Sequence, residues 1–180
     1  QFFNTHKWVL ILIFIAVLCR VPLLSQLPRW DSGEYYYRLI LGTHHFEYTG
    51  FKEFVENYAL CGHPTLGFCL VYLPGELAFS QEVIGVTLTS LILTTLALWC
   101  VYRIFLKILP QVTEGKAAVC TFLLSFSPLF FGMTMYFNPD YALAVFFIFL
   151  LYSYVYDKAV LAAFFSLLCF QTKETGLVLV

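Results

Sequence analysis

Two carboxylates, Asp31 and Glu34, stand three residues apart, directly after a strongly apolar segment and just before three consecutive tyrosines. A carboxylate in a cavity with hydrophobic walls can have its pKa raised and act as a general base. The same spacing also suits the start of a helix, with Asp as the N-cap and Glu at the third helical position. From the spacing alone, the helix cap is the better interpretation.

Two other motifs place polar groups at the start of apolar segments. Asn138, Pro139 and Asp140 form an ordinary helix start, with a cap, a proline in the first turn and an acid near the positive helix end. His63 precedes a proline, and a single histidine in a loop is usually structural. The sequence identifies no cofactor, although Asp31 and Asp140 could share a divalent cation.

Lys173 and Glu174 fit a purely structural role least well. Only about 14 residues separate Lys173 from Ala159, where the last apolar segment begins. A helix of that length spans ~21 Å, less than the ~30 Å hydrocarbon core of a bilayer. Ionisable groups near that depth are costly and usually functional. A lipid phosphate would suit Lys173, although Glu174 or Asp140 could instead neutralise it and make the pair structural.

Composition places these motifs in an integral membrane protein. Hydrophobic residues make up 61% of the 180 residues and charged residues only 12%. A net charge of -1 leaves no basic surface for nucleic acid, so we exclude that class of partner. The chain begins with Gln1 and stops inside an apolar run, so we expect an N-terminal part of a longer protein whose first apolar segment is retained as a signal anchor.

The apolar pattern predicts an all-α polytopic fold. The five expected spans are residues 8–24, 83–109, 117–137, 139–156 and 159–180. Residues 25–82 form a long outer loop with helical pieces at 32–41 and 51–60. A further apolar run, 64–79, is broken by Pro74, Gly75 and Glu76, which favours a helix in the membrane interface.

Basic residues in the short loops predict the orientation. Their excess favours the cytoplasm for the N-terminus and for residues 103–116 and 157–158; the residues concerned are Lys7, Arg103, Lys107, Lys116 and Lys158. The outer loop, the 136–140 turn and the end of the last span then share the extracytoplasmic face. We therefore expect Asp31, Glu34, Asp140 and Glu174 on one face.

In order and spacing, these motifs resemble those of the C-type glycosyltransferases, specifically the superfamily of protein O-mannosyltransferases and aminoarabinose transferases (glycosyltransferase family 39 and relatives). The matching stretches cover nearly the whole chain and are WDSGEYYY at 30–37, HPTL at 63–66, SP at 127–128, NPD at 138–140 and TKETG at 172–176. The chain departs from the family's pattern at two places. The family's adjacent Asp-Glu is Asp-Ser-Gly-Glu here, and its His-Pro-Pro is His-Pro-Thr. The first leaves open which carboxylate is the base.

The resemblance implies transfer of a sugar, with inversion, from a polyprenyl-phosphate carrier to a hydroxyl of a glycan, lipid or protein. By analogy, Asp31 is the base, with Glu34 as the other candidate, and Lys173 stabilises the leaving phosphate. The other substrate-binding candidates are Glu34, His63, Asp140 and Glu174. We expect the active site on the extracytoplasmic side, and favour the bacterial inner membrane over the endoplasmic reticulum.

Two other functions compete with this interpretation. A polytopic transporter or lipid flippase could use Asp31, Asp140 and the Lys173–Glu174 pair as a proton or substrate path. Such a protein should carry ionisable groups near the middle of its spans, whereas here the centres of spans two to four carry none. A non-catalytic scaffold subunit among membrane lipids would leave the depth of Lys173 unexplained.

Overall fold

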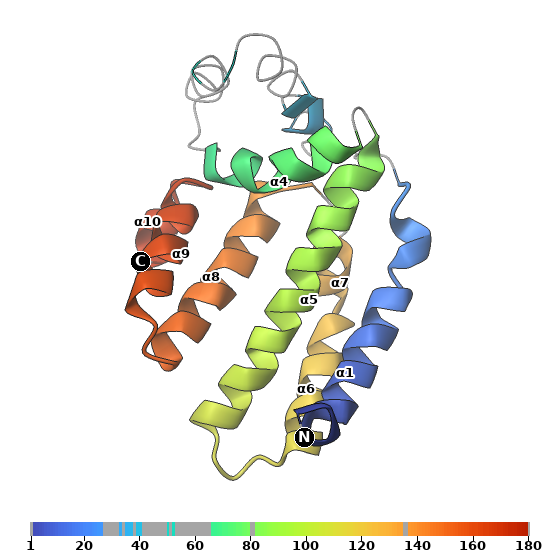
Figure 1. Cartoon of the computed structure of the whole chain (residues 1–180), viewed down its shortest axis with the longest axis vertical. Helices are drawn as coiled ribbons and strands as arrows, with labels where there is room; N and C mark the ends of the chain where they lie inside the picture. The colour runs from blue at the N-terminus through green and yellow to red at the C-terminus, as the bar shows by residue number, and fades with distance from the viewer. Residues whose placement is uncertain are drawn as a thin grey trace.

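The computed structural model describes residues 2–26, 33, 35–37, 39–40, 50, 52, 66–79, 82–134 and 137–179, and every regular element within them is a helix (Figure 1). The predicted all-α class is therefore confirmed for this part of the chain. The elements are α1 (Phe2–Leu18), the 3-10 helix η1 (Val21–Leu23), α4 (Leu66–Ala78), α5 (Val83–Ile108), α6 (Glu114–Ser125), α7 (Pro128–Met133), α8 (Pro139–Val155), α9 (Ala159–Phe170) and α10 (Gly176–Leu179).

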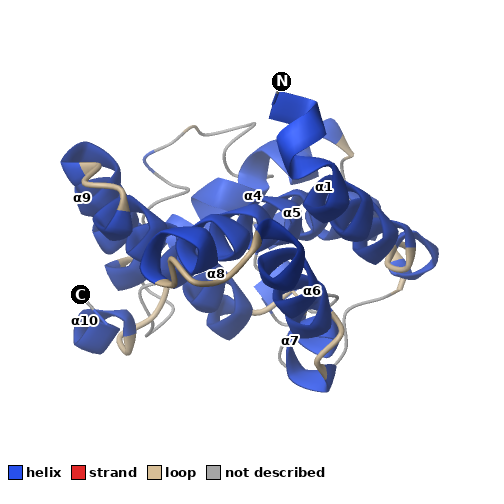
Figure 2. Ribbon diagram, turned by 90° about the horizontal axis from the view of Figure 1, so that it is seen from below, coloured by secondary structure: helices blue, strands red, loops and turns tan. Residues whose placement is uncertain are grey.

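Helix α5 lies at the centre of the bundle. It packs against α8 on one side and against α1 and α6 on the other, and α9 packs on the far side of α8 (Figures 1 and 2). Helix α4 lies across one end of these helices, near the starts of α5 and α8. We call this the α4 end, and we call the opposite end, where α1 begins and α5 is followed by α6, the basal end.

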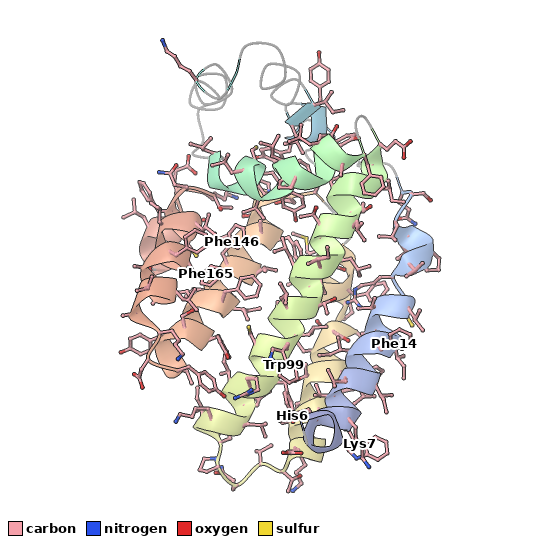
Figure 3. The ribbon with its side chains drawn as sticks, in the orientation of Figure 1. His6, Lys7, Phe14, Trp99, Phe146 and Phe165 are labelled. Atoms are coloured by element: carbon pink, nitrogen blue, oxygen red, sulfur yellow. The ribbon has the colours of Figure 1, made fainter. Side chains whose placement is uncertain are left out.

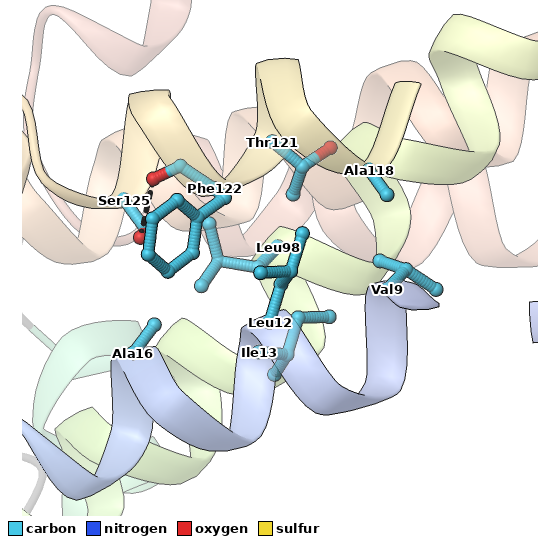
Figure 4. A pocket seen from close by; sticks show the side chains of 9 residues that line it. All are labelled: Val9, Leu12, Ile13, Ala16, Leu98, Ala118, Thr121, Phe122 and Ser125. Atoms are coloured by element: carbon cyan, nitrogen blue, oxygen red, sulfur yellow. Dashed lines mark hydrogen bonds between the residues drawn. The ribbon is translucent and has the colours of Figure 1, made fainter. Parts of the chain in front are cut away.

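Two apolar cores hold the bundle together. One joins α4, α5, α8 and α9, and includes Phe146 of α8 with Phe165 packed against it (Figure 3). The other joins α1, α5 and α6 around Val9, Leu98 and Tyr102. A small crevice lies beside this second core (Figure 4), but it is apolar and has no room for a water molecule. It is therefore a packing defect and not a candidate site.

The predicted span 117–137 is wrong as a single helix, because the chain breaks between α6 and α7. Ser127 is extended, with ψ 136°, and Pro128 occupies the first position of α7. Proline disfavours the helical conformation in the residue before it and has no N–H for the preceding turn. The Ser-Pro pair therefore ends α6 and starts a second, short helix.

The predicted span 159–180 is also wrong as one helix. Helix α9 ends at Phe170, and a turn separates it from α10. The turn brings Gly176 so close to α9 that a Cβ there would collide with the carbonyl group of Cys169. The chain thus folds back on α9 in the segment that contains Lys173. The tight α8–α9 hairpin at 157–158, by contrast, is confirmed, with Asp157 at φ 53°.

Arg20 fastens the end of α1 to the α6–α7 break, although it is fully buried. Its guanidinium donates to Ala16 O at 2.8 Å, to Thr134 Oγ1 at 3.1 Å and to Ser125 O. It also lies over the Phe131 ring, 4.4 Å from the centroid. Sequence analysis did not single out Arg20, because two of its three acceptors, Thr134 and Ser125, lie more than 100 residues away in the chain.

Two segments are long and apolar enough to cross a membrane, His6–Leu23 and Val83–Ile108. Helices α8 and α9 are apolar but shorter, with 17 and 12 residues. Large apolar side chains cover the outside of the bundle; among them Phe14 is 61% exposed, Leu123 63% and Val160 84%. Such surfaces are typical of contact with lipid, so length and surface both indicate membrane association.

Candidate functional site at the α4 end

Two of the predicted site residues form an ion pair at the α4 end. Lys173 Nζ lies 2.6 Å from Asp140 Oδ1, joining the first turn of α8 to the turn after α9. Their side chains are 32% and 52% exposed. Glu174 follows in the same turn and is exposed. The other predicted site residues, Asp31, Glu34 and His63, lie outside the described residues.

The start of α8 is built by local sequence, as predicted. Asn138 is extended, and its side-chain oxygen accepts a hydrogen bond from the Asp140 N–H at 2.7 Å. Pro139 fills the first helical position, where no N–H is needed. Just before the cap, Phe137 packs against Phe68 and Tyr72 of α4, with centroids 4.5 and 4.8 Å apart. Asp140 is thus held on a rigid helix end.

The TKETG motif divides into residues that build the turn and residues that it presents. Thr172 is fully buried, and its hydroxyl donates to Leu168 O at 2.6 Å. Gly176 allows the close approach to α9, and its N–H donates to Lys173 O at 2.9 Å. Between them in the chain, Lys173 is partly exposed and Glu174 is exposed. The chemistry of the motif therefore resides in these two residues.

Helix α4 fixes the position of the turn. The N–H of Gly67 donates to Gln171 O at 2.9 Å, and a Cβ on Gly67 would lie 2.9 Å from the Gln171 side chain. At its other end, α4 crosses the start of α5 where Gly75 meets Gly85 with no room for a Cβ on either. These backbone contacts place Lys173 beside the start of α4 and Asp140.

Asp140 is the main influence on the charge of Lys173. The hydrogen bond to this carboxylate raises the pKa of the ammonium above its usual value, and the nearby Tyr35 and Glu174 act in the same direction. Partial burial opposes the shift. Lys173 is therefore cationic at neutral pH, and within the described part of the chain its ammonium donates to one acceptor. An anionic oxygen could take a remaining N–H.

Tyrosines from the outer loop pack against the same end. Tyr35 and Tyr36 are helical, in agreement with the predicted helix at 32–41, and contact Phe68 and Phe137 through edge-to-face rings. Burial, followed by the charges of Glu76 and Glu82, raises the pKa of Tyr36 to about 12. Tyr35 and Tyr36 therefore meet the N-terminal half of α4 and the residue just before α8.

Glu76 is a residue whose burial the sequence analysis missed. It belongs to α4 and is 1% exposed, whereas the sequence suggested only an acid on the outer face. Its signal in the sequence is an acid inside an otherwise apolar helix. The α4 end therefore buries a carboxylate whose charge acts on Tyr36.

Known proteins offer no guide to this site: no family model, curated protein or solved structure matches the chain. Among the described residues, no three histidine, cysteine or acidic side chains are grouped so as to hold a metal ion. The predicted cation shared by Asp31 and Asp140 involves a residue outside them and stays a prediction. The described site consists of one ammonium group, its carboxylate partner and the aromatic side chains around them.

Proposed function

We propose that the protein is a membrane glycosyltransferase that moves a sugar from a polyprenyl-phosphate carrier to an acceptor hydroxyl, with inversion. The observation that carries the proposal is the Asp140–Lys173 pair, partly exposed at one end of an apolar bundle. A lysine held by a single carboxylate beside apolar surface suits a lipid whose tail is hydrophobic and whose head is a phosphate.

The residues have separate roles in this reaction. Lys173 stabilises the phosphate as it leaves the anomeric carbon, because a fixed cation favours the charge that develops there. Asp31, or Glu34 in its place, takes the proton of the attacking hydroxyl, which typically accelerates a reaction ~10²–10⁴-fold. His63, Asp140 and Glu174 orient the acceptor or a divalent cation.

The proposal includes five crossings, formed by α1, α5, the α6–α7 pair, α8 and α9, with the α4 end outside. Its support is the charge at the basal end, where Arg103 and Lys107 lie in the last turns of α5, Lys116 in the first turn of α6 and Lys158 just before α9. Such an excess favours the cytoplasmic side. In a bacterial inner membrane, sugar transfer would then take place on the outer face.

A transporter or lipid flippase is the second candidate, and Arg20 is the observation that favours it. A buried cation beside a broken helix is a feature of transport paths. However, three protein acceptors and the Phe131 ring already hold the guanidinium. Arg20 thus serves as a fixed clamp, and we prefer the transferase.

A lipid titration tests the role of Lys173. Purified full-length protein in detergent is titrated with polyprenyl phosphate and with the matching polyprenol, which lacks the phosphate. Lys173→Gln should weaken phosphate binding at least ~10-fold, corresponding to loss of one charge-assisted contact. Polyprenol should bind the parent and Lys173→Gln with similar affinity. Sugar transfer from the polyprenyl-phosphate donor should fall in parallel.

Lys116→Gln is the matched control, because it removes the same charge from an exposed site at the basal end. It should leave polyprenyl phosphate binding unchanged. Thermal unfolding of each variant separates binding from folding. Unchanged phosphate affinity in Lys173→Gln, together with a lower unfolding temperature, would reject the phosphate role and leave a structural ion pair.

A further inference from the structure

A second cationic site lies at the basal end, opposite the ion pair, where α5 meets the end of α8. The Tyr156 hydroxyl donates to Arg103 O at 2.9 Å, and Arg103 Nε is 3.3 Å from the same hydroxyl. The guanidinium carbon lies 5.3 Å from the Tyr156 ring centroid and 5.8 Å from that of Trp99. Two aromatic rings and a hydroxyl therefore fix the direction of the Arg103 side chain.

The outer N–H groups of Arg103 are available. In the part of the chain that the structure describes, no carboxylate lies within ion-pair distance of this guanidinium, and its terminal nitrogens donate to no protein acceptor. Lys107 follows four residues later and therefore lies on the same side of α5. Lys158, two residues after Tyr156, is exposed in the adjacent turn. Two exposed lysines thus lie at the same end of the bundle as the fixed donor fork of Arg103.

The surroundings combine positive charge with apolar surface. The described residues at the basal end include five cations (Lys7, Arg103, Lys107, Lys116 and Lys158) against two acids (Glu114 and Asp157). Next to Lys107, Ile108 is 56% exposed, and on α8 Tyr154 is 77% exposed. Trp99 and His6 add an edge-to-face aromatic pair nearby (Figure 3). A free anion would use only the charge, whereas a phospholipid would use both surfaces.

We propose that Arg103, Lys107 and Lys158 bind the phosphate of an anionic membrane phospholipid. The planar guanidinium can hold two phosphate oxygens, and the lysines add point charges. Tryptophan and tyrosine favour the level of the lipid headgroups, where Trp99 and Tyr156 would then lie. The inference rests on the membrane placement in the proposed function and is independent of sugar transfer.

Trp99 provides a reporter within the site itself. A background of Trp8→Phe and Trp30→Phe leaves Trp99 as the one tryptophan of these 180 residues, and any tryptophan elsewhere in the protein is replaced by phenylalanine as well. This full-length protein in detergent is titrated with phosphatidylglycerol, phosphatidylcholine or inorganic phosphate. Phosphatidylglycerol should change Trp99 fluorescence saturably, while the other two should not at the same concentrations. Arg103→Gln and Lys107→Gln should each raise the midpoint about fivefold.

Lys116→Gln is the control for nonspecific attraction, because it removes one charge from the basal end on a different helix. It should leave the midpoint unchanged. Equal weakening by Lys116→Gln, an equal response to inorganic phosphate, or no response to phosphatidylglycerol would each overturn the site. Lys107 is exposed, so its variant keeps the test valid if Arg103→Gln fails to fold.

Lys173→Gln separates this inference from the proposed function. That variant should bind phosphatidylglycerol at the basal end with an unchanged midpoint, even where it has lost polyprenyl phosphate binding. A shift of the Trp99 midpoint in Lys173→Gln would contradict a separate site. Failure of polyprenyl phosphate to bind at Lys173 would reject the donor role alone.

Discussion

At the level of single residues, Asp31 offers the sharpest separation of catalysis from structure. Asn caps a helix almost as well as Asp but is no base. If Asp31 is the base, Asp31→Asn should abolish sugar transfer while insertion, thermal stability and polyprenyl phosphate binding stay close to those of the parent. Glu34→Gln is measured beside it, because the opened Asp-Ser-Gly-Glu motif leaves two candidates. Full transfer by Asp31→Asn would return that residue to the role of a cap.

Asp140 should control the protonation of Lys173. Because the Asp140 hydrogen bond raises the pKa of the ammonium, Asp140→Asn should lower it. Competitive labelling of the amine across an alkaline pH series would measure this shift. The pair's small stabilisation, ~0–1 kcal/mol for an exposed pair, is fully present below the pKa of an unfolded lysine, about 10.4, and is lost as the pH rises through the higher folded value.

An amine in Asp140→Asn that labels with the pH dependence of the parent would contradict this coupling. So would an alkaline loss of stability that persists unchanged in the variant. Asn138→Ala, which removes the cap but keeps the carboxylate, is a useful comparison. It should weaken the start of α8, typically by ~1 kcal/mol, with less effect on the amine.

Among the elements, the turn after α9 depends on backbone space. Gly176→Ala should displace the turn, because the added methyl meets the Cys169 carbonyl group. We expect a loss of about 1–3 kcal/mol in stability, together with weaker polyprenyl phosphate binding. Gly132→Ala in α7 is the control, because a Cβ there has no neighbour within 4 Å. Equal behaviour of the two variants in thermal unfolding would show that the close approach is unimportant.

Local signals predicted the elements well where neighbours in sequence decide the structure. Asn138 and Pro139 start α8, and Asp157 lies in the tight turn between α8 and α9, as expected. A length rule for membrane spans failed at 117–137 and 159–180, because it counts apolar residues and ignores the geometry of Pro128 and Gly176. The partner of Lys173 was left open between Asp140 and Glu174, since a contact 33 residues away depends on tertiary packing.

For the whole molecule, charge separates the two ends of an apolar bundle. Glu174→Cys at the α4 end and Lys116→Cys at the basal end, each in a background without the natural cysteines, should react with an impermeant maleimide from opposite sides of intact cells. The proposed orientation predicts that Glu174→Cys reacts from outside. Labelling of both from one side would contradict a bundle that crosses the membrane between these ends.

The clamp formed by Arg20 has a consequence for biosynthesis. Its acceptor Thr134 is made 114 residues later, which takes roughly 6–23 seconds at typical translation rates of ~5–20 residues per second. Throughout that interval Arg20 lacks Thr134, and for most of it also Ser125, so Ala16 is the one acceptor of the three already made. Helix α1 therefore cannot dock in its final position as it leaves the ribosome. In the proposed membrane topology, α1 stays near the headgroups or beside the insertion machinery until α7 is made, so the order of docking differs from the order of synthesis.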